Sequence, residues 1–384
     1  MEDWLPQLYQ KQGTEAGIAP RVLANANLTA KSIRAVNRHV PILFSLNHLA
    51  VRCGVPYSFL RAVVERHDFQ FYRSFRIRKR PLKGRVRFRL ISAPVPFLMR
   101  VQRWIAQEIL SNGYPHETST AYAKRSSPLK AAALHCDARW LIKIDVMNFF
   151  ESITEVSAYR AFRRLGYQPL LSFEMARLST RVRSALRQLP SPYWHTQAHR
   201  WPKIESYQCW RKGGLPQGAP TSPMLANLAS IALDECLAEV ARKYRLTYSR
   251  YADDLCFSTS GDFSRKDCAG VISEVYAGLR KFGLRPQTMK TTVSPPGARK
   301  VVLGLLVDRN TPHLTREFKA RLRQHLHYLR KADVGPARHA ERRGFSSVIG
   351  LRHHVEGLVE YASSVDAVYG ESRRRELAEV SWPF

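Results

Sequence analysis

The chain has 384 residues, 45% of them hydrophobic, which is enough for two or three domains with a substantial core. This composition excludes a disordered chain, and no apolar run approaches the length of a membrane-spanning helix. The formal net charge is +30, which favours a polyanionic partner, nucleic acid first and a membrane surface as the lesser alternative.

The first forty residues give no clear indication of fold, and they lack the apolar segment of a signal peptide. Six cysteines are scattered along the chain without a Cys-x-x-Cys pair. This usage is typical of reduced thiols and argues against a zinc site. We therefore expect a cytoplasmic protein with no membrane partner.

A strongly basic segment follows helical patterns at residues 45–67 and precedes another at 98–110. Residues 73–89, RSFRIRKRPLKGRVRFR, contain nine basic side chains and no acidic one. The alternation in RVRFRLI predicts a strand with one cationic face, and residues 81–84 predict the turn of a hairpin. A solvated surface is the plainer alternative, but like charges along one strand are costly without a partner. We expect these side chains to contact nucleic acid: Arg76, Arg78, Arg80, Lys83 and Arg85.

Three aspartates end predicted strands in the middle of the chain. Asp145 closes the apolar run 141–146, and Asp253 and Asp254 lie in RYADDLCFS, between predicted strands at 246–251 and 254–259. A lone aspartate there could be a helix N-cap. Three carboxylates converging at strand ends suit hard divalent cations, and two such ions about 4 Å apart can drive an in-line phosphoryl transfer.

The last seventy residues predict helices, because apolar side chains recur there at helical spacing. This apolar stripe comprises Leu314, Phe318, Leu322, Leu326 and Leu329. Basic side chains lie off the stripe, among them Lys319 and Arg323, which we expect to track backbone phosphates without reading bases.

These motifs resemble, in order and spacing, those of reverse transcriptases over about residues 45–310. YADD at 251–254, KIDVMNFF at 143–150 and GLPQGAPTSPMLANL at 214–228 resemble the three core palm motifs. FRIRK at 75–79 and RLISAP at 89–94 resemble the fingers motifs, and KFGLRPQTMKT at 281–291 resembles the motif after the catalytic hairpin. Among subfamilies the chain looks most like retron and other bacterial, defence-associated enzymes.

The resemblance implies an α+β right-hand polymerase fold with an antiparallel palm sheet and a helical thumb. The expected boundaries are an extension at 1–44, fingers at 45–140, a palm at 141–312 with a fingers insertion at about 155–212, and a thumb at 313–384. The implied activity is RNA-directed DNA synthesis from deoxynucleoside triphosphates. The implied cofactor is a pair of Mg²⁺ ions, for which Mn²⁺ could substitute.

The resemblance also implies roles for single residues. Asp145, Asp253 and Asp254 match the catalytic, metal-binding triad. Five further positions match nucleotide-binding residues: Lys79, Arg89, Phe150, Gln217 and Lys290. Of these, Phe150 would reject a 2′-hydroxyl, although an ordinary core aromatic is the alternative, and Lys290 could equally be a solvated loop lysine.

The sequence departs from the retron pattern at two points. Retrons carry Asn-Ala-x-x-His before the first aspartate motif, whereas this chain has Ala131 in place of the asparagine and keeps His135. Retrons also carry Val-Thr-Gly after the catalytic hairpin, whereas Leu303 replaces the threonine here. A structured non-coding RNA, an effector protein or a second copy of the chain are the partners implied. A non-catalytic RNA-binding scaffold and a template-independent or protein-primed polymerase stay open as alternatives.

Overall fold

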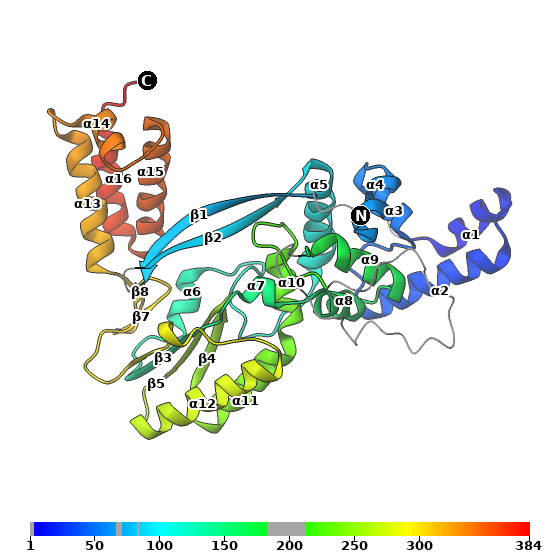
Figure 1. Cartoon of the computed structure of the whole chain (residues 1–384), viewed down its shortest axis with the longest axis horizontal. Helices are drawn as coiled ribbons and strands as arrows, with labels where there is room; N and C mark the ends of the chain where they lie inside the picture. Colours follow the sequence, from blue (N-terminus) through cyan, green and yellow to red (C-terminus); the bar gives the residue numbers. More distant parts are fainter. Residues whose placement is uncertain (1–3, 67–70, 83–84, 183–211) are drawn as a thin grey trace. The chain divides into compact units, whose positions relative to one another are not determined.

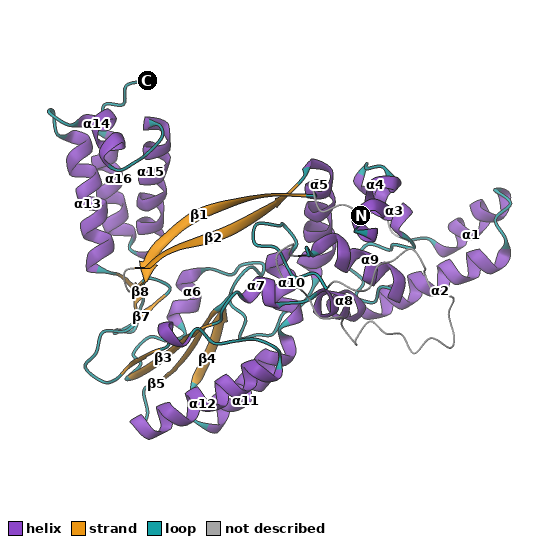
Figure 2. Ribbon diagram, viewed as in Figure 1, coloured by secondary structure: helices purple, strands orange, loops and turns teal. Residues whose placement is uncertain are grey.

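The structure is a computed structural model that describes residues 4–66, 71–82, 85–182 and 212–384, without the side chains of 79–82, 85 and 87. The chain forms two compact units. The first comprises Met1–Lys124, Val146–Leu237 and Tyr276–Pro286, and the second comprises Arg125–Asp145, Ala238–Val275 and Gln287–Phe384. Figures 1 and 2 show the helices and strands of each.

The first unit is mainly helical. Its helices are α1 (Pro6–Glu15), α2 (Pro20–Val36), α3 (Leu46–Cys53), α4 (Tyr57–Glu65), α5 (Pro96–Trp104), α7 (Phe149–Ser152), α8 (Glu155–Arg164), α9 (Pro169–Ser179) and α10 (Ser222–Ala229), with short turns η1 (Ile105–Ile109) and η2 (Leu110–Asn112). The helical pattern at 45–67 is divided in two, because Gly54 ends α3 in the left-handed conformation at φ 61° and Pro56 precedes α4. Helices α1 and α2 lie within the first forty residues, whose fold could not be predicted from their sequence.

The basic segment is an antiparallel hairpin, as predicted. Strand β1 (Tyr72–Leu82) pairs with β2 (Arg85–Pro94). Arg76 and Arg78 lie opposite Leu90 and Phe88, whereas Arg89 lies opposite Ile77. Because directly opposite residues share a face, Arg76 and Arg78 lie on one face of the ribbon and Arg89 on the other. The sequence predicted one cationic face on a single strand. In the two-stranded hairpin, arginines lie on both faces.

The second unit is built around a four-stranded antiparallel sheet in the order β4-β5-β3-β6. Its strands are β3 (Trp140–Asp145), β4 (Thr247–Tyr251), β5 (Asp254–Thr259) and β6 (Thr292–Ser294). The three strands predicted from the sequence are confirmed to within one residue. On one face of the sheet Tyr248 stacks on Phe257 at 4.7 Å between ring centroids, which gives that face a buried aromatic pair. Helices α11 (Ile231–Lys243) and α12 (Arg265–Lys281) each extend across both units.

The opposite face of the sheet is held by a buried histidine. Helix α6 (Pro128–Ala133) is followed by His135, which is fully buried. The Nδ1 and Nε2 atoms of His135 each lie 2.7 Å from a serine hydroxyl, Ser258 on β5 and Ser249 on β4. One imidazole therefore joins the two strands that flank the YADD turn.

The C-terminal part of this unit is a helical bundle, as the sequence predicts. It contains α13 (Arg316–Arg330), α14 (Gly335–Arg342), α15 (Val348–Val365) and α16 (Ala367–Ala378). Leu322, Leu326 and Leu329 of the apolar stripe are buried in its core. Leu314 is also buried there, but it lies in a strand, β9 (His313–Leu314), not in the helix. That strand pairs with β8 (Leu305–Leu306), which pairs with β7 (Val301–Val302).

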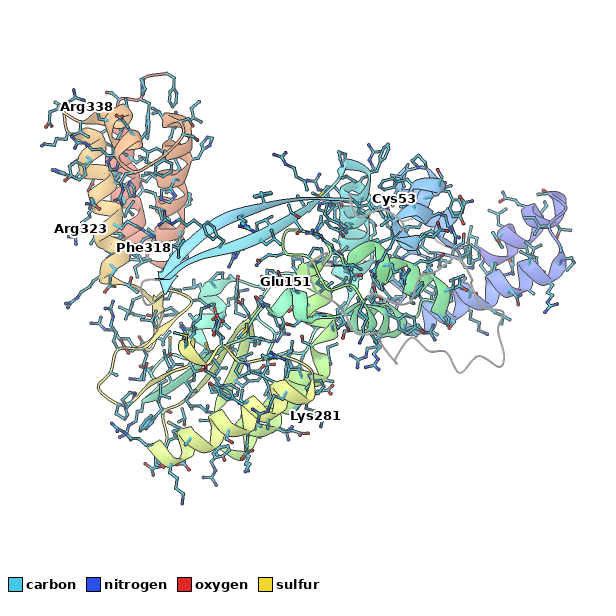
Figure 3. All side chains as sticks on the ribbon, in the orientation of Figure 1. Cys53, Glu151, Lys281, Phe318, Arg323 and Arg338 are labelled. Atoms are coloured by element: carbon cyan, nitrogen blue, oxygen red, sulfur yellow. The ribbon has the colours of Figure 1, made fainter. Side chains whose placement is uncertain are left out.

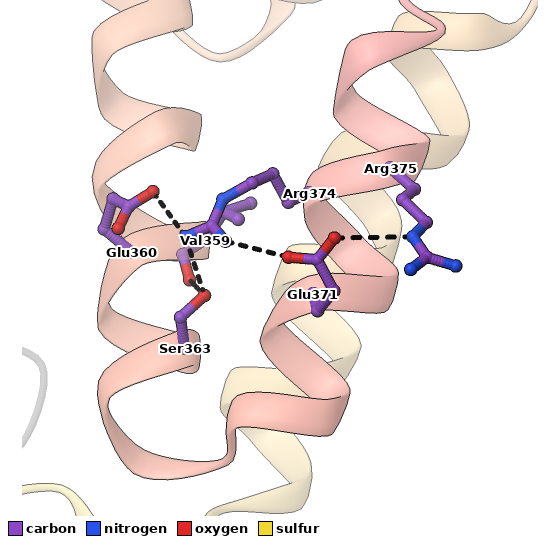
Figure 4. A network of polar contacts seen from close by, with 6 residues as sticks. All are labelled: Val359, Glu360, Ser363, Glu371, Arg374 and Arg375. Atoms are coloured by element: carbon purple, nitrogen blue, oxygen red, sulfur yellow. Dashed lines mark hydrogen bonds and ion pairs between the residues drawn. The ribbon is translucent and has the colours of Figure 1, made fainter.

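Helices α15 and α16 approach closely because a glycine faces a serine between them. A Cβ atom on Gly370 would lie 2.3 Å from Cα of Ser363, so only glycine fits. Figure 4 shows the polar contacts beside this crossing. The Arg374 guanidinium donates to Glu360 at 2.9 Å and to Glu371 at 2.9 Å, and the Ser363 hydroxyl donates to the Val359 carbonyl at 3.0 Å. These exposed ion pairs contribute little to stability next to the packing.

The buried histidine predicts a loss of stability in mild acid. Burial lowers the pKa of His135 to about 4, against about 6.5 in an unfolded chain. Between these two values the unfolded chain binds the proton more tightly, so stability is full above pH 6.5 and is lost as the pH falls towards 4. From pH 7.5 to 5 we expect His135 to cost about 2 kcal/mol of unfolding free energy. Urea unfolding at both pH values, compared between wild type and His135→Gln, measures this. An equal fall in unfolding free energy between the two pH values in the variant would contradict the assignment to His135. His325, whose pKa is also about 4, is present in both proteins and contributes equally to both.

Candidate active site

Two of the three predicted catalytic aspartates lie directly opposite each other at the end of the sheet. Asp145 is the last residue of β3 and pairs in register with Asp254, the first residue of β5. The carboxylates therefore belong to one face of the sheet, on adjacent strands. Asp253 lies in the two-residue turn between β4 and β5. The register thus pairs the two strand ends that the sequence predicted to lie together, and the metal-binding role of the aspartates stays a prediction.

The turn that carries Asp253 is held in an uncommon conformation. Ala252 has φ 56°, in the left-handed region that non-glycine residues seldom adopt. The fully buried Arg250 donates from Nη1 to the Ala252 carbonyl at 3.3 Å. A strained turn supported by a buried guanidinium is typical of a site where position matters more than stability.

Negative charge accumulates at this end of the sheet. The pKa of Asp254 is raised to about 6, first by burial and then by the neighbouring Asp253 carboxylate, while the ammonium groups of Lys143 and Lys290 oppose the rise. Lys290, in η4 (Thr288–Lys290), places its Nζ 2.5 Å from Oδ2 of Asp145. The sequence predicted a phosphate-binding role for Lys290, and the structure shows its ammonium neutralising a carboxylate of the triad.

The donor chemistry of this site fits a hard divalent cation. Carboxylate oxygens are the ligands such ions prefer, and a cation would relieve the repulsion between Asp253 and Asp254 that raises the pKa. Within the described residues, however, no group of three or more His, Cys, Asp or Glu side chains is gathered as a ready metal site. Asp145 is instead engaged by Lys290. The ion pair engages Oδ2 alone, so Asp145 could offer its other carboxylate oxygen to a divalent ion.

Phe150, the predicted sugar gate, lies in α7 of the first unit. Its neighbour Phe149 is the buried aromatic, 3% exposed, whereas Phe150 is only partly buried. The Phe150 ring lies 5.7 Å from Phe149 and 6.2 Å from Tyr122, which is itself exposed. Phe149 is therefore the more deeply buried ring of the pair, and the role of Phe150 at the sugar stays a prediction.

The Gln217 loop is attached to the basic hairpin within the same unit. The Gln217 carbonyl accepts from the Ser92 backbone N–H at 2.8 Å. Gly218 has φ 108°, and a Cβ atom there would lie 2.7 Å from Ile91 Cγ2 on β2. Gly214 passes so close to the chain that its Cβ would lie 2.5 Å from the Glu151 carbonyl oxygen. These glycines therefore permit tight packing of the loop against its own unit.

The described cations of the hairpin are exposed. Arg76, Arg78 and Arg89 are all solvent-accessible. Lys83 lies outside the described residues, and so do the side chains of Lys79, Arg80 and Arg85. Their assignments remain predictions from the sequence.

The two predicted phosphate-tracking cations of α13 differ in their surroundings. The Lys319 ammonium lies 3.4 Å from an Asp366 carboxylate oxygen and 4.4 Å from the centre of the Tyr369 ring, in a half-exposed contact with the start of α16. Arg323 is exposed and is labelled on the α13 surface in Figure 3. Of the two, Arg323 is the one available to bind a phosphate without breaking an internal contact.

Sequence reasoning missed Lys143 and Arg250, which accompany the carboxylates in the second unit, and Tyr122, which lies beside Phe150 in the first. Arg250 is part of the RYADD motif, and a buried arginine beside a turn could have been suspected from the apolar residues around it. Lys143 is part of KIDVMNFF, where alternation along the strand puts it on the same face as Asp145. Tyr122 lies outside every recognised motif, and no sequence signal pointed to it.

Comparison with known proteins decides the family. The model of the family described as reverse transcriptase (RNA-dependent DNA polymerase) matches residues 77–301, more than half of the chain. The chain belongs to the reverse transcriptase family. This reverse transcriptase accordingly has the right-hand polymerase fold, with mixed helices and antiparallel sheets, and is an RNA-directed DNA polymerase.

Similar curated proteins are retron enzymes. The Retron Ec86 reverse transcriptase of Escherichia coli is 27% identical over 91% of this chain and 92% of its own length. The Retron Ec83 reverse transcriptase, also from Escherichia coli, is 26% identical over 81% of this chain and 90% of its own length. Among solved structures, a Candida albicans telomerase covers 82% of this chain and 57% of its own at 9% identity, with a TM-score of 0.40, too distant to carry an argument. Among the described residues, no helix is both long enough and apolar enough to span a bilayer.

Proposed function

We propose that this reverse transcriptase extends a primer on an RNA template by a mechanism that uses two divalent metal ions, Mg²⁺ in the cell. The observation that carries the proposal is the pairing of Asp145 with Asp254 across β3 and β5, next to Asp253 in the strained turn. Bound ions would activate the attacking hydroxyl and stabilise the departing pyrophosphate. The protein's own contribution is to hold the carboxylates on a rigid sheet.

The Lys290 ion pair fits this mechanism as a counter-charge. The Asp253 and Asp145 carboxylates act on Asp254 and raise its pKa, and an ammonium 2.5 Å from Asp145 limits the cost of that repulsion. A divalent ion held by Asp145, Asp253 and Asp254 would take over that counter-charge. The Lys290 ammonium, close to the same carboxylates, would then be available to the phosphates of an incoming nucleotide, which is the role that the sequence motif predicts.

We further propose that the template is a structured retron-like RNA and that the enzyme acts in the cytoplasm in antiviral defence. Similarity to retron enzymes over nine-tenths of the chain supports the assignment. The two departures from the retron motifs have clear structural settings. Ala131 is buried in α6, and Leu303 has φ 50° in the turn between β7 and β8. An effector protein or a second copy of the chain would complete such a system.

A primer-extension assay tests the polymerase proposal. Purified protein with a primed RNA template, deoxynucleoside triphosphates and Mg²⁺ should give template-dependent DNA, and chelation of the metal should stop synthesis. Product made without a template would favour terminal addition, and no product from folded, RNA-binding protein would favour a scaffold. Sequencing the nucleic acid that co-purifies with the protein tests the retron proposal separately, because a structured RNA joined to or copied into DNA is expected.

Changing the predicted sugar gate should alter the choice of nucleotide. Phe150→Ala removes the ring that would meet a 2′-hydroxyl, so incorporation of ribonucleotides should rise relative to deoxynucleotides by about tenfold or more. The ratio of kcat/KM for the two nucleotides on one template measures this. Phe149→Leu is the matched control, because that change affects the buried neighbour and should leave the ratio unchanged. An unchanged ratio in folded Phe150→Ala would show that this ring does not face the sugar.

A further inference from the structure

Lys143 occupies an unusual position for a lysine. It lies in β3, a central strand of the sheet, and is only partly exposed. Strand alternation puts it on the same face as Asp145, one step further from the strand end. Its register partners are Cys256 on β5 and Thr292 on β6, neither of which is an acid.

The charge of Lys143 has no hydrogen-bonded or ion-paired partner among the residues that the structure describes. Asp145 is engaged by Lys290 at 2.5 Å, whereas the Lys143 ammonium acts on Asp254 without forming a close ion pair. A partly buried ammonium that makes no hydrogen bond with the described residues leaves its donors to solvent or to a ligand.

The surroundings limit where an anion could meet this ammonium. Two residues beyond Lys143 on the same face, Leu141 is buried in a cluster with Val302 and Leu305. Along this face of β3, the carboxylate of Asp145 is followed by the ammonium of Lys143 and then by the apolar side chain of Leu141. Anything that reaches Lys143 must lie across the sheet next to the carboxylate pair.

We propose that Lys143 binds a backbone phosphate at the 3′ end of the primer. This inference rests on the proposed function, because it requires the reacting hydroxyl to lie at Asp145 and Asp254. Two residues along a strand span about 7 Å, which is of the order of one nucleotide of backbone. A primer whose 3′-hydroxyl lies at the carboxylates thus carries its nearest phosphodiesters past Lys143. The ammonium acts as a point charge and reads no sequence.

Primers with a single neutral phosphate test this proposal directly. One phosphodiester at a time is replaced by a neutral methylphosphonate, at each of the last six linkages of the primer and at the template linkages that face them. The affinity of the protein for each primer–template is then measured by fluorescence anisotropy, without nucleotide. In wild type, one position near the primer's 3′ end should weaken binding roughly tenfold to a hundredfold, as expected for a hydrogen bond to a charged group. In Lys143→Met the same primer should bind no worse than the unmodified one. Lys143→Arg should restore the sensitivity.

Controls separate this result from misfolding and from failure of the polymerase proposal. Lys143→Met should unfold cooperatively, as wild type does, because the ammonium makes no hydrogen bond or close ion pair that the change would break. Lys266→Met removes an equally positive but exposed side chain and should leave the phosphate scan unchanged. Because binding is measured without catalysis, the scan supports or refutes the role of Lys143 even if the enzyme makes no DNA.

Two results would overturn the proposal. If the methylphosphonate and Lys143→Met effects add at every position, Lys143 contacts no primer phosphate. If Lys143→Met instead raises KM for the nucleotide while the scan stays as in wild type, the ammonium serves the triphosphate.

Discussion

Replacing both aspartates of the YADD turn, Asp253→Asn with Asp254→Asn, should abolish DNA synthesis while RNA binding stays near that of wild type. The carboxylates are assigned to metal, and loss of metal-based charge stabilisation is worth several kcal/mol, or roughly a thousandfold in rate. Affinity for RNA is assigned to lysine and arginine instead. Single-turnover extension and RNA binding at fixed salt measure the two properties.

The structure also predicts that this double variant folds well. The pKa of Asp254 is raised to about 6 by burial and by Asp253. At pH 7 the ionised carboxyl group therefore has a higher free energy in the folded state than in the unfolded state. Asparagine removes that cost, and the unfolding temperature should therefore not fall. Asp262→Asn, at an exposed position outside the sheet, is the control for loss of a carboxylate. Loss of RNA binding in a folded double variant would contradict the division between metal and phosphate contacts.

Much of the catalytic sheet could be predicted from the sequence because its signals are local. Apolar runs of strand length ended at acidic residues, and alternation placed those residues on defined faces. The pairing of β3 with β5 needed the structure, because membership of one antiparallel sheet does not fix which strands are neighbours. The strand ends that carry Asp145 and Asp254 nevertheless lie side by side, as expected, although about 110 residues separate them.

The contacts that complete the site could not be predicted, because they join residues distant in sequence and depend on side-chain packing. The Lys290 ion pair with Asp145 spans 145 residues, and His135 joins serines more than a hundred residues away. Leu314 had helical spacing but lies in β9, because burial against the bundle satisfied its apolar side chain in either conformation. The assignment of arginines to the two faces of the hairpin likewise depends on the pairing register of β1 and β2, which the sequence of one strand does not reveal.

The opposite faces of the hairpin give the second large expected effect. Arg76 and Arg78 lie together on one face and are exposed, so they are placed to neutralise phosphates of an extended RNA strand. Arg76→Glu with Arg78→Glu should reduce the slope of log affinity against log salt by about 1.4, if each contacts one phosphate of a single strand. At 0.1 M salt the same loss corresponds to about twentyfold weaker binding or more.

Arg89 lies on the other face of the hairpin, opposite Ile77, and should behave differently. If it grips the triphosphate, Arg89→Ala should raise the Michaelis constant for nucleotide and leave the RNA salt slope unchanged. A paired reversal at the exposed positions Arg265 and Lys266 has the same change in net charge as the Arg76 and Arg78 reversal and controls for long-range repulsion. RNA affinity against salt and extension rate against nucleotide concentration separate the two faces. Should Arg89→Ala weaken RNA binding and spare the nucleotide dependence, both faces of the hairpin hold template, because a cation that binds RNA phosphates alters the salt slope whichever face carries it.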